Sequence, residues 1–258
     1  TTQLNCWCHP SLTTFMNMTL NRPLLQKHLP TLLDLADVYD QSFSFSASGS
    51  EHRALIGWYT PNAPIDILAN MFIDWGIPPQ FVQQWRLNTP DTEGVGISFN
   101  QDLSSIRLYT HKWSDLTLED TGVPVYKGFK LLKDQTLRVD DYVNCGDLRS
   151  HDNLAHAQSR SKYPEWIERL NQLAASDAPL LFTRTNNTSR QSWLVTARYA
   201  DLSANAIAGP AFAGYKLLHL AGGIDAVKGE FSTIYIQTDR PEVQDFLNGK
   251  IFPVFDIT

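Results

Sequence analysis

Basic residues, cysteines and long apolar runs are all scarce in this chain of 258 residues. Lys and Arg number 21 against 27 Asp and Glu, so the formal net charge is −6. A nucleic-acid partner would call for a basic excess that exchanges counterions with phosphates, and there is none. No apolar run approaches the roughly 18 residues that cross a bilayer. The composition therefore argues against a nucleic-acid or membrane partner.

The chain has only three cysteines, Cys6, Cys8 and Cys145. An odd number does not suit a disulfide framework and favours a reducing compartment. Because no signal-peptide pattern is visible either, the sequence predicts a cytoplasmic protein. Cys6-Trp7-Cys8-His9 lacks the second ligand pair that structural zinc requires, so we expect no metal site there.

Several catalytic and cofactor motifs are missing as well. No Gly-x-Ser-x-Gly elbow supports a hydrolase, and no glycine-rich phosphate fingerprint follows a predicted strand. His151-Asp152 with His156 and the lone pair Asp140-Asp141 are too sparse to indicate a metal. The sequence predicts no resident metal or cofactor.

Two hydrophobic periodicities are present, and they alternate along the chain. Spacing of about 3.6 residues predicts helices over 24–38 (interrupted by Pro30), 65–75, 81–87, 163–170, 212–220 and from 239 onward. Strict alternation predicts the strand pairs 42–48 with 51–60, 94–99 with 105–111, 125–132 with 136–143 and 180–185 with 191–199, and a ninth strand over 231–238. Residues 146–161 are polar and predict a loop.

Helices that separate hairpins, rather than single strands, argue against a parallel sheet. The order predicts an α+β fold in one domain over residues 1–258, with an irregular segment over 1–22. Nine to ten antiparallel strands would leave unpaired edges in an open sheet, and a closed barrel removes them. We therefore expect a barrel with helices packed outside, in which the third hairpin lacks a helix.

Residues at i and i+2 share a face of a strand, so alternation also assigns faces. Arg107, Tyr109 and His111 share one face, opposite Ile106 and Leu108. The same rule groups Glu51 with Arg53 and Tyr59, Tyr126 with Lys130, Arg138 with Asp140 and Tyr142, Arg184 with Phe182, and Arg198 with Thr196 and Ser192. With helices outside, these polar faces line a lumen; in the simpler one-sided sheet they meet solvent.

The residue types favour the lumen. Arg and Tyr recur on four hairpins instead of a mixture of Lys, Glu, Ser and Thr. Such a set suits a site for an anionic or phosphorylated ligand.

The alternation of helices and hairpins around a barrel with Arg, Lys and Tyr inside resembles the aromatic prenyltransferases of the αββα barrel type. The resemblance implies that basic residues hold an isoprenoid diphosphate, that tyrosines shield the allylic cation, and that an acidic residue on an early strand contacts an indole or phenol. Glu51 best matches the acidic residue. The positions that match the diphosphate ligands are Arg53, Arg107, Lys130, Arg138, Arg184 and Arg198, and those that match the shield are Tyr59, Tyr109, Tyr126 and Tyr199.

The predicted function is therefore prenyl transfer from an allyl diphosphate to an aromatic acceptor in natural-product biosynthesis, with Glu51 assisting proton removal. Magnesium is expected only as a companion of the diphosphate. The alternatives are a cyclase of an aromatic precursor, with Glu51 or His111 as the acid–base group, a non-catalytic ligand-binding barrel, and an interaction protein. A closed lumen with a carboxylate beside arginines favours an enzyme, and an apolar lumen favours a binding protein. A filled interior with an exposed apolar patch favours an interaction protein. If Glu51 is the base, Glu51→Gln abolishes turnover and leaves stability almost unchanged.

Overall fold

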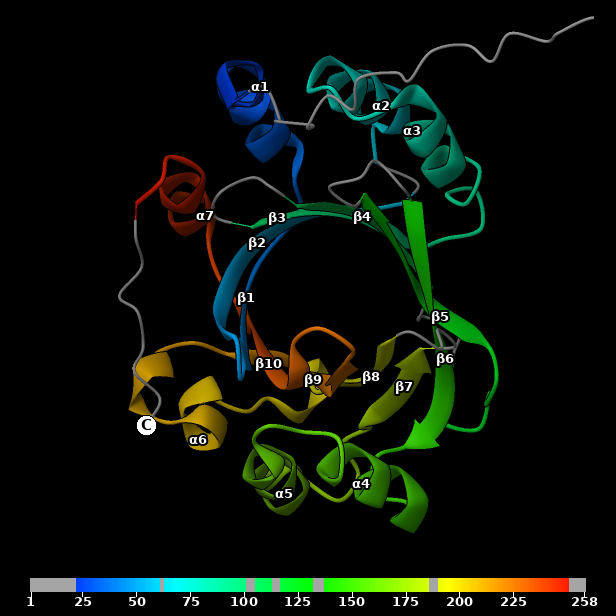
Figure 1. The fold of residues 1–258 in the computed structure, drawn as a ribbon, viewed down its shortest axis with the longest axis vertical. Coiled ribbons are helices and arrows are strands. Elements are labelled where there is room, and N and C mark those ends of the chain that lie inside the picture. Colours follow the sequence, from blue (N-terminus) through cyan, green and yellow to red (C-terminus); the bar gives the residue numbers. More distant parts are fainter. Residues whose placement is uncertain are drawn as a thin grey trace, which may run out of the picture.

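The chain forms a closed antiparallel β-barrel of ten strands with its helices outside (Figure 1). The computed structural model describes residues 22–60, 63–100, 105–112, 117–131, 137–185 and 190–250. Each strand pairs with its neighbours in sequence, and β1 pairs with β10 to close the barrel. The strands are β1 Val38–Ser46, β2 Gly49–Tyr59, β3 Gly94–Asn100, β4 Ile106–His111, β5 Pro124–Leu131, β6 Leu137–Asp147, β7 Leu181–Thr185, β8 Arg190–Thr196, β9 Leu217–Asp225 and β10 Gly229–Gln237.

The helices cover the barrel in two groups, which Figure 1 shows on opposite sides of the ring of strands. One group lies against β2, β3 and β4, and the other lies against β7 to β10. The first group is α1 Arg22–Leu35, α2 Ile65–Asp74, α3 Pro79–Arg86 and α7 Arg240–Leu247, and the second is α4 His151–Gln158, α5 Pro164–Leu173 and α6 Ala204–Ala208 with the short 3₁₀ helices η1 Arg198–Ala200 and η2 Pro210–Phe212.

The hydrophobic core lies between the barrel and these helices, not inside the barrel. Trp58 on β2 packs in one cluster with Phe72 and Trp85 of the first helix group. Trp193 on β8 packs in the other with Trp166 of α5. Burying side chains of this size stabilises the fold by about 1.5–3 kcal/mol each. The outer faces of the strands are thus apolar, and the inner faces are free to carry polar groups.

The two ends of the barrel differ. Because the strands run up and down in sequence order, the strand ends that the five hairpins join lie at one end of the barrel, which we call the hairpin end. The helical connections lie at the other, the crossover end. Between β4 and β5 the described part of residues 112–123 contains turns and no helix, as expected for the third hairpin.

The predicted barrel with outer helices is confirmed, but three elements were predicted wrongly. Residues 212–220 were expected to form a helix, whereas β9 begins at Leu217 and supplies the tenth strand. The expected loop over 146–161 contains α4, which Ser150 caps by accepting a hydrogen bond from the Asn153 amide. The strand expected to reach residue 199 ends at Thr196, and η1 follows.

Candidate functional site

Alternation along the strands places a set of polar and charged side chains inside the barrel. Ile56 and Leu108 face the helices and are fully buried in the core. The residues between them therefore point the other way. The predicted site residues that line the lumen are Glu51, Arg53 and Tyr59 on β2, Arg107, Tyr109 and His111 on β4, Tyr126 and Lys130 on β5, and Arg198 on η1.

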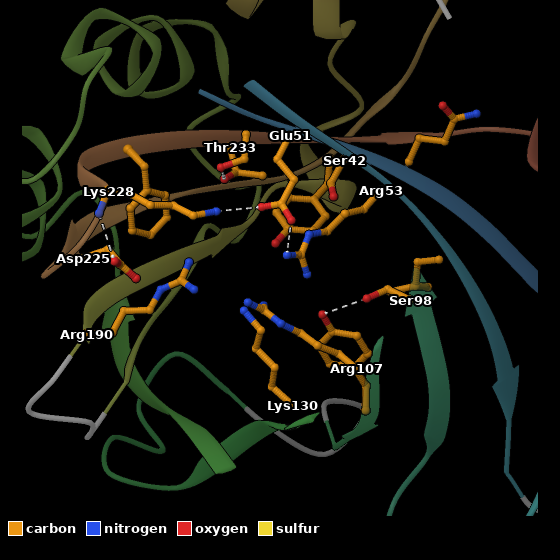
Figure 2. A pocket seen from close by; sticks show the side chains of 16 residues that line it. Ser42, Glu51, Arg53, Ser98, Arg107, Lys130, Arg190, Asp225, Lys228 and Thr233 are labelled. Atoms are coloured by element: carbon orange, nitrogen blue, oxygen red, sulfur yellow. Dashed lines mark hydrogen bonds and ion pairs between the residues drawn. The ribbon is translucent and has the colours of Figure 1, made fainter. Parts of the chain in front are cut away.

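A basic cavity of about 680 Å³, which includes space open to solvent, lies at the hairpin end (Figure 2). Its charged lining consists of five basic and two acidic side chains, so basic groups are in excess. Hydroxyls of Ser42, Ser44, Ser98 and Thr233 supply additional hydrogen-bonding groups around the wall. The charged residues of the basic cavity are Arg53, Arg107, Lys130, Arg190, Lys228, Glu51 and Asp225.

Three basic side chains, which form a cation ladder when all are protonated, lie on adjacent strands. Lys130 on β5 lies directly opposite Arg107 on β4 and directly opposite Arg138 on β6. Like charges in such cross-strand positions destabilise a sheet. Asp140 balances Arg138, with 3.0 Å between Nη2 and Oδ2, whereas no ion pair reaches Arg107 or Lys130 within the described residues. The arrangement favours an anionic ligand between these strands.

Two buried donors of the basic cavity have no partner among the described residues. They are Nε of Arg107 and Nε of Arg190. Arg190 also stacks on Phe231, with 4.6 Å from its guanidinium carbon to the ring centroid. A buried guanidinium N–H that lacks an acceptor costs free energy, which an oxyanion would recover.

Glu51 is held as a fixed anion at the edge of this cavity. Its Oε1 lies 2.5 Å from Nη2 of Arg53, and its Oε2 lies 3.0 Å from Nζ of Lys228 (Figure 2). Burial alone would raise the pKa of Glu51, but Arg53 and Lys228 together outweigh it and lower the pKa to about 2. At neutral pH such a carboxylate is a weak proton acceptor.

An aromatic cavity of about 890 Å³ lies at the crossover end. It shares Leu55, Arg107, Tyr109 and Tyr235 with the basic cavity, so the two cavities adjoin inside the barrel. Side chains from distant strands meet in it: Tyr126 Oη lies 2.8 Å from Thr196 Oγ1 of β8. The rings that line the aromatic cavity are Tyr59, Tyr109, His111, Tyr126, Tyr142, His219 and Tyr235.

Asp40 on β1 is the acidic residue of the aromatic cavity. Its Oδ1 is buried and has no hydrogen-bond partner among the described residues. Burial raises the pKa of Asp40 to about 7, although nearby Arg198 opposes the shift. A carboxyl group with a pKa near neutrality can both accept and release a proton, as general acid–base catalysis requires.

Two histidines of the aromatic cavity are neutral at physiological pH. Burial and the charge of Arg198 lower the pKa of His111 to about 4 and that of His219 to about 3. The pKa of Tyr126 is raised by burial, so its hydroxyl stays protonated. This end of the lumen therefore offers neutral rings, one protonatable carboxyl group and the guanidinium groups of Arg107 and Arg198.

The structure does not bring every predicted residue into the lumen. Arg184 shares the outer face of β7 with Phe182, and its Nε donates to Cys145 Sγ at 3.2 Å. Tyr199 is 57% exposed on η1, because β8 ends three residues earlier. Both inward assignments are thus corrected. Arg138 adjoins the basic cavity through Lys130 but does not line it.

The sequence analysis missed several lumen residues. Asp40 fell in the connection between the helix predicted over 24–38 and the strand predicted from residue 42, and His219 fell within the helix predicted over 212–220. Arg190 was assigned to the connection between two strands, and Lys228 to the connection between the helix predicted over 212–220 and the strand predicted over 231–238. Tyr235 lay in a correctly predicted strand and could have been found from its alternation with Ile234 and Ile236, which are buried on the outer side.

The described residues contain no group of three or more His, Cys, Asp or Glu side chains arranged to hold a metal ion. That statement covers His151, Asp152 and His156 on α4 and the pair Asp140-Asp141 on β6. Cys6, Cys8 and His9 lie outside the described residues.

In the described parts of the chain, no helix is both long enough and apolar enough to cross a lipid bilayer.

The fold is similar to that of solved aromatic prenyltransferases. Prenyltransferase PriB in its apo form matches with a TM-score of 0.53 and 13% identity over 79% of this chain and 81% of PriB. The 5-dimethylallyltryptophan synthase from Streptomyces coelicolor matches with a TM-score of 0.53 and 10% identity over 86% of this chain and 93% of the synthase. No protein-family model matches the sequence, and no curated protein matches it either. The chain thus has the αββα barrel fold of the aromatic prenyltransferases.

Proposed function

We propose that this protein transfers a prenyl group from an allyl diphosphate to an aromatic acceptor within its lumen. The observation that carries the proposal is that a basic cavity and an aromatic cavity adjoin inside one barrel. A diphosphate fits the first, and an allyl group and an aromatic ring fit the second. The acceptor is a small aromatic molecule of the indole or phenol class.

The basic cavity supports the diphosphate half of the proposal. Its arginines present planar guanidinium groups whose donors match phosphate oxygens. The Nε atoms of Arg107 and Arg190 have no hydrogen-bond acceptor among the described residues. Ionisation of the allylic C–O bond leaves negative charge on the diphosphate. Cations already in place stabilise that charge without reorganisation. Magnesium as a companion of the diphosphate stays a prediction.

The aromatic cavity supports the acceptor half. Tyr109 and Tyr235 lie where the two cavities join, so their rings flank the place where the allylic cation forms. Aromatic faces stabilise a cation and exclude water that would quench it. The ring of the acceptor attacks the cation, and a proton then leaves the new tetrahedral carbon.

Asp40, rather than Glu51, is suited to take that proton. Asp40 lies in the aromatic cavity with a pKa of about 7, whereas both oxygens of Glu51 are engaged by cations and its pKa is about 2. We therefore assign Asp40 the base role, and Glu51 the task of positioning Arg53 and Lys228 for the diphosphate.

Structures with the same fold hold ligands of both kinds. One structure of PriB holds the product diphosphate, and matches this chain with a TM-score of 0.52 and 13% identity over 78% of this chain and 80% of PriB. The Streptomyces coelicolor synthase has been solved with DMASPP and Trp, and that structure matches with a TM-score of 0.51 and 11% identity over 92% of each chain. These ligands make tryptophan a natural first acceptor to test.

The test combines binding and turnover. Thermal unfolding is followed with pyrophosphate, with dimethylallyl diphosphate, and with indole and phenol acids, each with MgCl₂ or with EDTA. A ligand that binds only the folded state raises the melting temperature. Incubation of dimethylallyl diphosphate with tryptophan or tyrosine is then analysed by mass spectrometry for a prenylated product. Stabilisation by pyrophosphate and a prenylated product support the proposal.

Two other outcomes would overturn it. Stabilisation by aromatic acids but not by pyrophosphate would indicate a cyclase or binding protein on the same scaffold. Absence of any response, from a protein that unfolds cooperatively, would indicate a different ligand class. The control variant is Lys127→Met on β5, because Lys127 faces outward toward Asn88 and Asp141 and should leave every response unchanged.

A further inference from the structure

Lys130 occupies the middle of the cation ladder in the basic cavity. Its neighbours across the two strand pairings are Arg107 and Arg138. Figure 2 shows Lys130 and Arg107 reaching into the cavity from neighbouring strands, with Arg190 on the opposite wall. Among the described residues, no carboxylate lies within ion-pair distance of the Lys130 amine.

The ionisable groups around Lys130 come from several strands of the barrel. The carboxylates are already engaged: Glu51 pairs with Arg53 and Lys228, Asp140 pairs with Arg138, and Asp225 accepts hydrogen bonds from the backbone amides of residues 227 and 228. The groups that face Lys130 are Glu51 and Arg53 of β2, Arg107 and Tyr109 of β4, Arg138, Asp140 and Tyr142 of β6, Arg190 of β8, Asp225 of β9, and Lys228 and Tyr235 of the β9–β10 hairpin. The field at the amine is therefore positive.

Burial, reinforced by Arg107, Arg53 and other arginines, lowers the pKa of Lys130 to about 6. At about pH 7.5 the amine of the empty protein is thus mostly neutral. A bound diphosphate adds several negative charges beside it and reverses the field. Because an opposite charge raises the pKa of an amine, the ligand would draw a proton onto Lys130.

The other basic groups of the cavity cannot perform this role equally well. Arginines keep their protons at all relevant pH values, so they bind an anion without donating a proton. Lys228 already pairs with Glu51. Tyr109 is the remaining proton donor, because Arg107 and Arg53 outweigh its burial and lower its pKa.

Resting on the proposed function, we propose that Lys130 takes up a proton when the diphosphate binds and donates that proton to the departing diphosphate. As the allylic C–O bond breaks, its electron pair goes to the oxygen, and Lys130 protonates the diphosphate. The acceptor ring supplies the pair for the new C–C bond, and its C–H proton leaves to Asp40. The products are the prenylated acceptor and protonated diphosphate, and Lys130 ends neutral. Lys130 is thus a catalytic acid as well as an anion ligand.

The first experiment measures proton uptake without any turnover. Pyrophosphate is titrated into the protein by calorimetry at about pH 7.5 in buffers of different ionisation enthalpy, which gives the protons exchanged on binding. Pyrophosphate itself exchanges protons, so the informative quantity is the difference between wild type and Lys130→Arg. The arginine keeps a charge at this position but is already protonated. We expect wild type to take up about one proton more than Lys130→Arg.

Control variants isolate Lys130 from its surroundings. Lys127→Arg on the outer face of the same strand and Tyr109→Phe should both keep the wild-type uptake. Lys130→Met removes the amine at similar side-chain length and should also lose about one proton of uptake, with weaker binding. Lys130→Met therefore tests the proposal even if Lys130→Arg does not fold.

The outcomes separate this inference from the proposed function. Binding of pyrophosphate with a difference near zero between wild type and both Lys130 variants would overturn the role of Lys130 and leave the diphosphate site intact. Absence of pyrophosphate binding to the folded wild type would overturn both. A loss of uptake in Tyr109→Phe instead would assign the proton to the tyrosine.

Turnover supplies a second readout once a product is detected. Lys130→Arg should bind pyrophosphate within about tenfold of wild type, yet turn over about 10²- to 10⁴-fold more slowly, the usual effect of losing a general acid. With a substrate whose leaving group needs no proton, the difference in turnover between wild type and Lys130→Arg should be smaller. Equal turnover by wild type and Lys130→Arg would contradict the proposal.

Discussion

Asp40 and Glu51 show how environment assigns different roles to two carboxyl groups in one lumen. Asp40 is buried among rings with an unpartnered oxygen, and its pKa rises to about 7. Glu51 contacts two cations, and its pKa falls to about 2. Pairs of titratable groups whose pKa values are pushed apart commonly mark the division between proton transfer and fixed charge. Residue type alone does not distinguish them.

Replacing Asp40 by asparagine tests the base role and the raised pKa together. Turnover of Asp40→Asn should fall about 10²- to 10⁴-fold. The folded state of wild type keeps a proton on Asp40 that the unfolded chain releases near pH 4, so its stability falls as the pH rises from about 4 to 7. Between pH 5 and pH 8 the variant should gain about 2 to 3 kcal/mol relative to wild type in urea unfolding.

The control for this substitution is Asp177→Asn, because Asp177 is exposed between α5 and β7. Asp177→Asn should turn over at the wild-type rate. An Asp40→Asn variant that turns over within twofold of wild type would remove Asp40 from the mechanism.

We expect Glu51→Gln to lower turnover much less than the loss of the catalytic base would. Turnover should stay within about tenfold of wild type, and folding should lose about 1 kcal/mol at neutral pH, because Arg53 and Lys228 lose their carboxylate partner. Removal of a negative charge should tighten pyrophosphate binding, measured by calorimetry. Abolished turnover with unchanged stability would restore Glu51 as the base.

At the residue scale, alternation predicted which side chains share a face, and burial in the structure shows which face is inside. Arg107, Tyr109 and Lys130 could be assigned to the lumen from pattern alone. The pKa values could not, because they depend on partners from other strands, such as Lys228 beside Glu51. Those partners are separated by 177 positions in the chain.

At the element scale, β9 explains why the tenth strand escaped prediction. Leucine, alanine and glycine carry little strand preference, and its periodicity suits a helix equally well. The glycines are explained by the neighbouring strand. A Cβ added to Gly222 would lie 2.6 Å from the Trp193 ring, and one added to Gly223 would lie 2.1 Å from the Gln191 carbonyl oxygen. Such close approach is visible only in three dimensions.

Gly223→Ala should therefore destabilise the barrel where β8 meets β9. Its φ of +152° is rarely adopted by other residues, and the added methyl would collide with backbone that has no room to move. We expect a loss of at least about 2 kcal/mol in urea unfolding. Gly128→Ala on β5 is the matched control, because its Cβ would meet the Tyr109 ring at an ordinary 3.5 Å. Equal stability of the two variants would contradict this account.

The other elements show where local patterns suffice. The hairpins were predicted because one face of each strand is apolar, and α7 because Asp239 and Glu242 form a capping box that is visible in the sequence. Helix α4 was missed because only Asn153 and Ala157 of its eight residues are buried. Closure of the barrel could be expected from edge strands, but not its strand number.

At the scale of the whole molecule, a protein with a net charge of −6 holds a basic cavity inside. The helices and the outer faces of the strands supply the stability through their apolar core. The lumen is then free to contain groups that destabilise the fold, such as the cation ladder. A trade of stability for function is common at active sites.

The buried histidines make the stability of the whole fold depend on pH. The pKa values of His52 and His111 are lowered to about 4 and that of His219 to about 3, chiefly by burial. Below about pH 6.5 the unfolded chain binds protons at these residues, and the folded chain does not until the pH reaches their lowered pKa values. Stability must therefore fall as the pH decreases through this window. Asp40 has the opposite effect, because the folded chain binds one proton more at this residue than the unfolded chain does.

His52, His111 and His219, less one proton for Asp40, give a net difference of at least about two protons near pH 5, and half-buried His156, whose pKa burial also lowers to about 4, adds to it. The free energy of unfolding should therefore fall by at least about 3 kcal/mol per pH unit there. His219→Gln should reduce that slope by about one proton, because it removes one of these sites. His151→Gln should leave the slope unchanged, since His151 is exposed on α4. Urea unfolding between pH 4.5 and 7 measures all three slopes. If His219→Gln and His151→Gln gave the same slope, His219 would have to be protonated in the folded lumen, and the aromatic cavity would carry an additional positive charge beside Arg198.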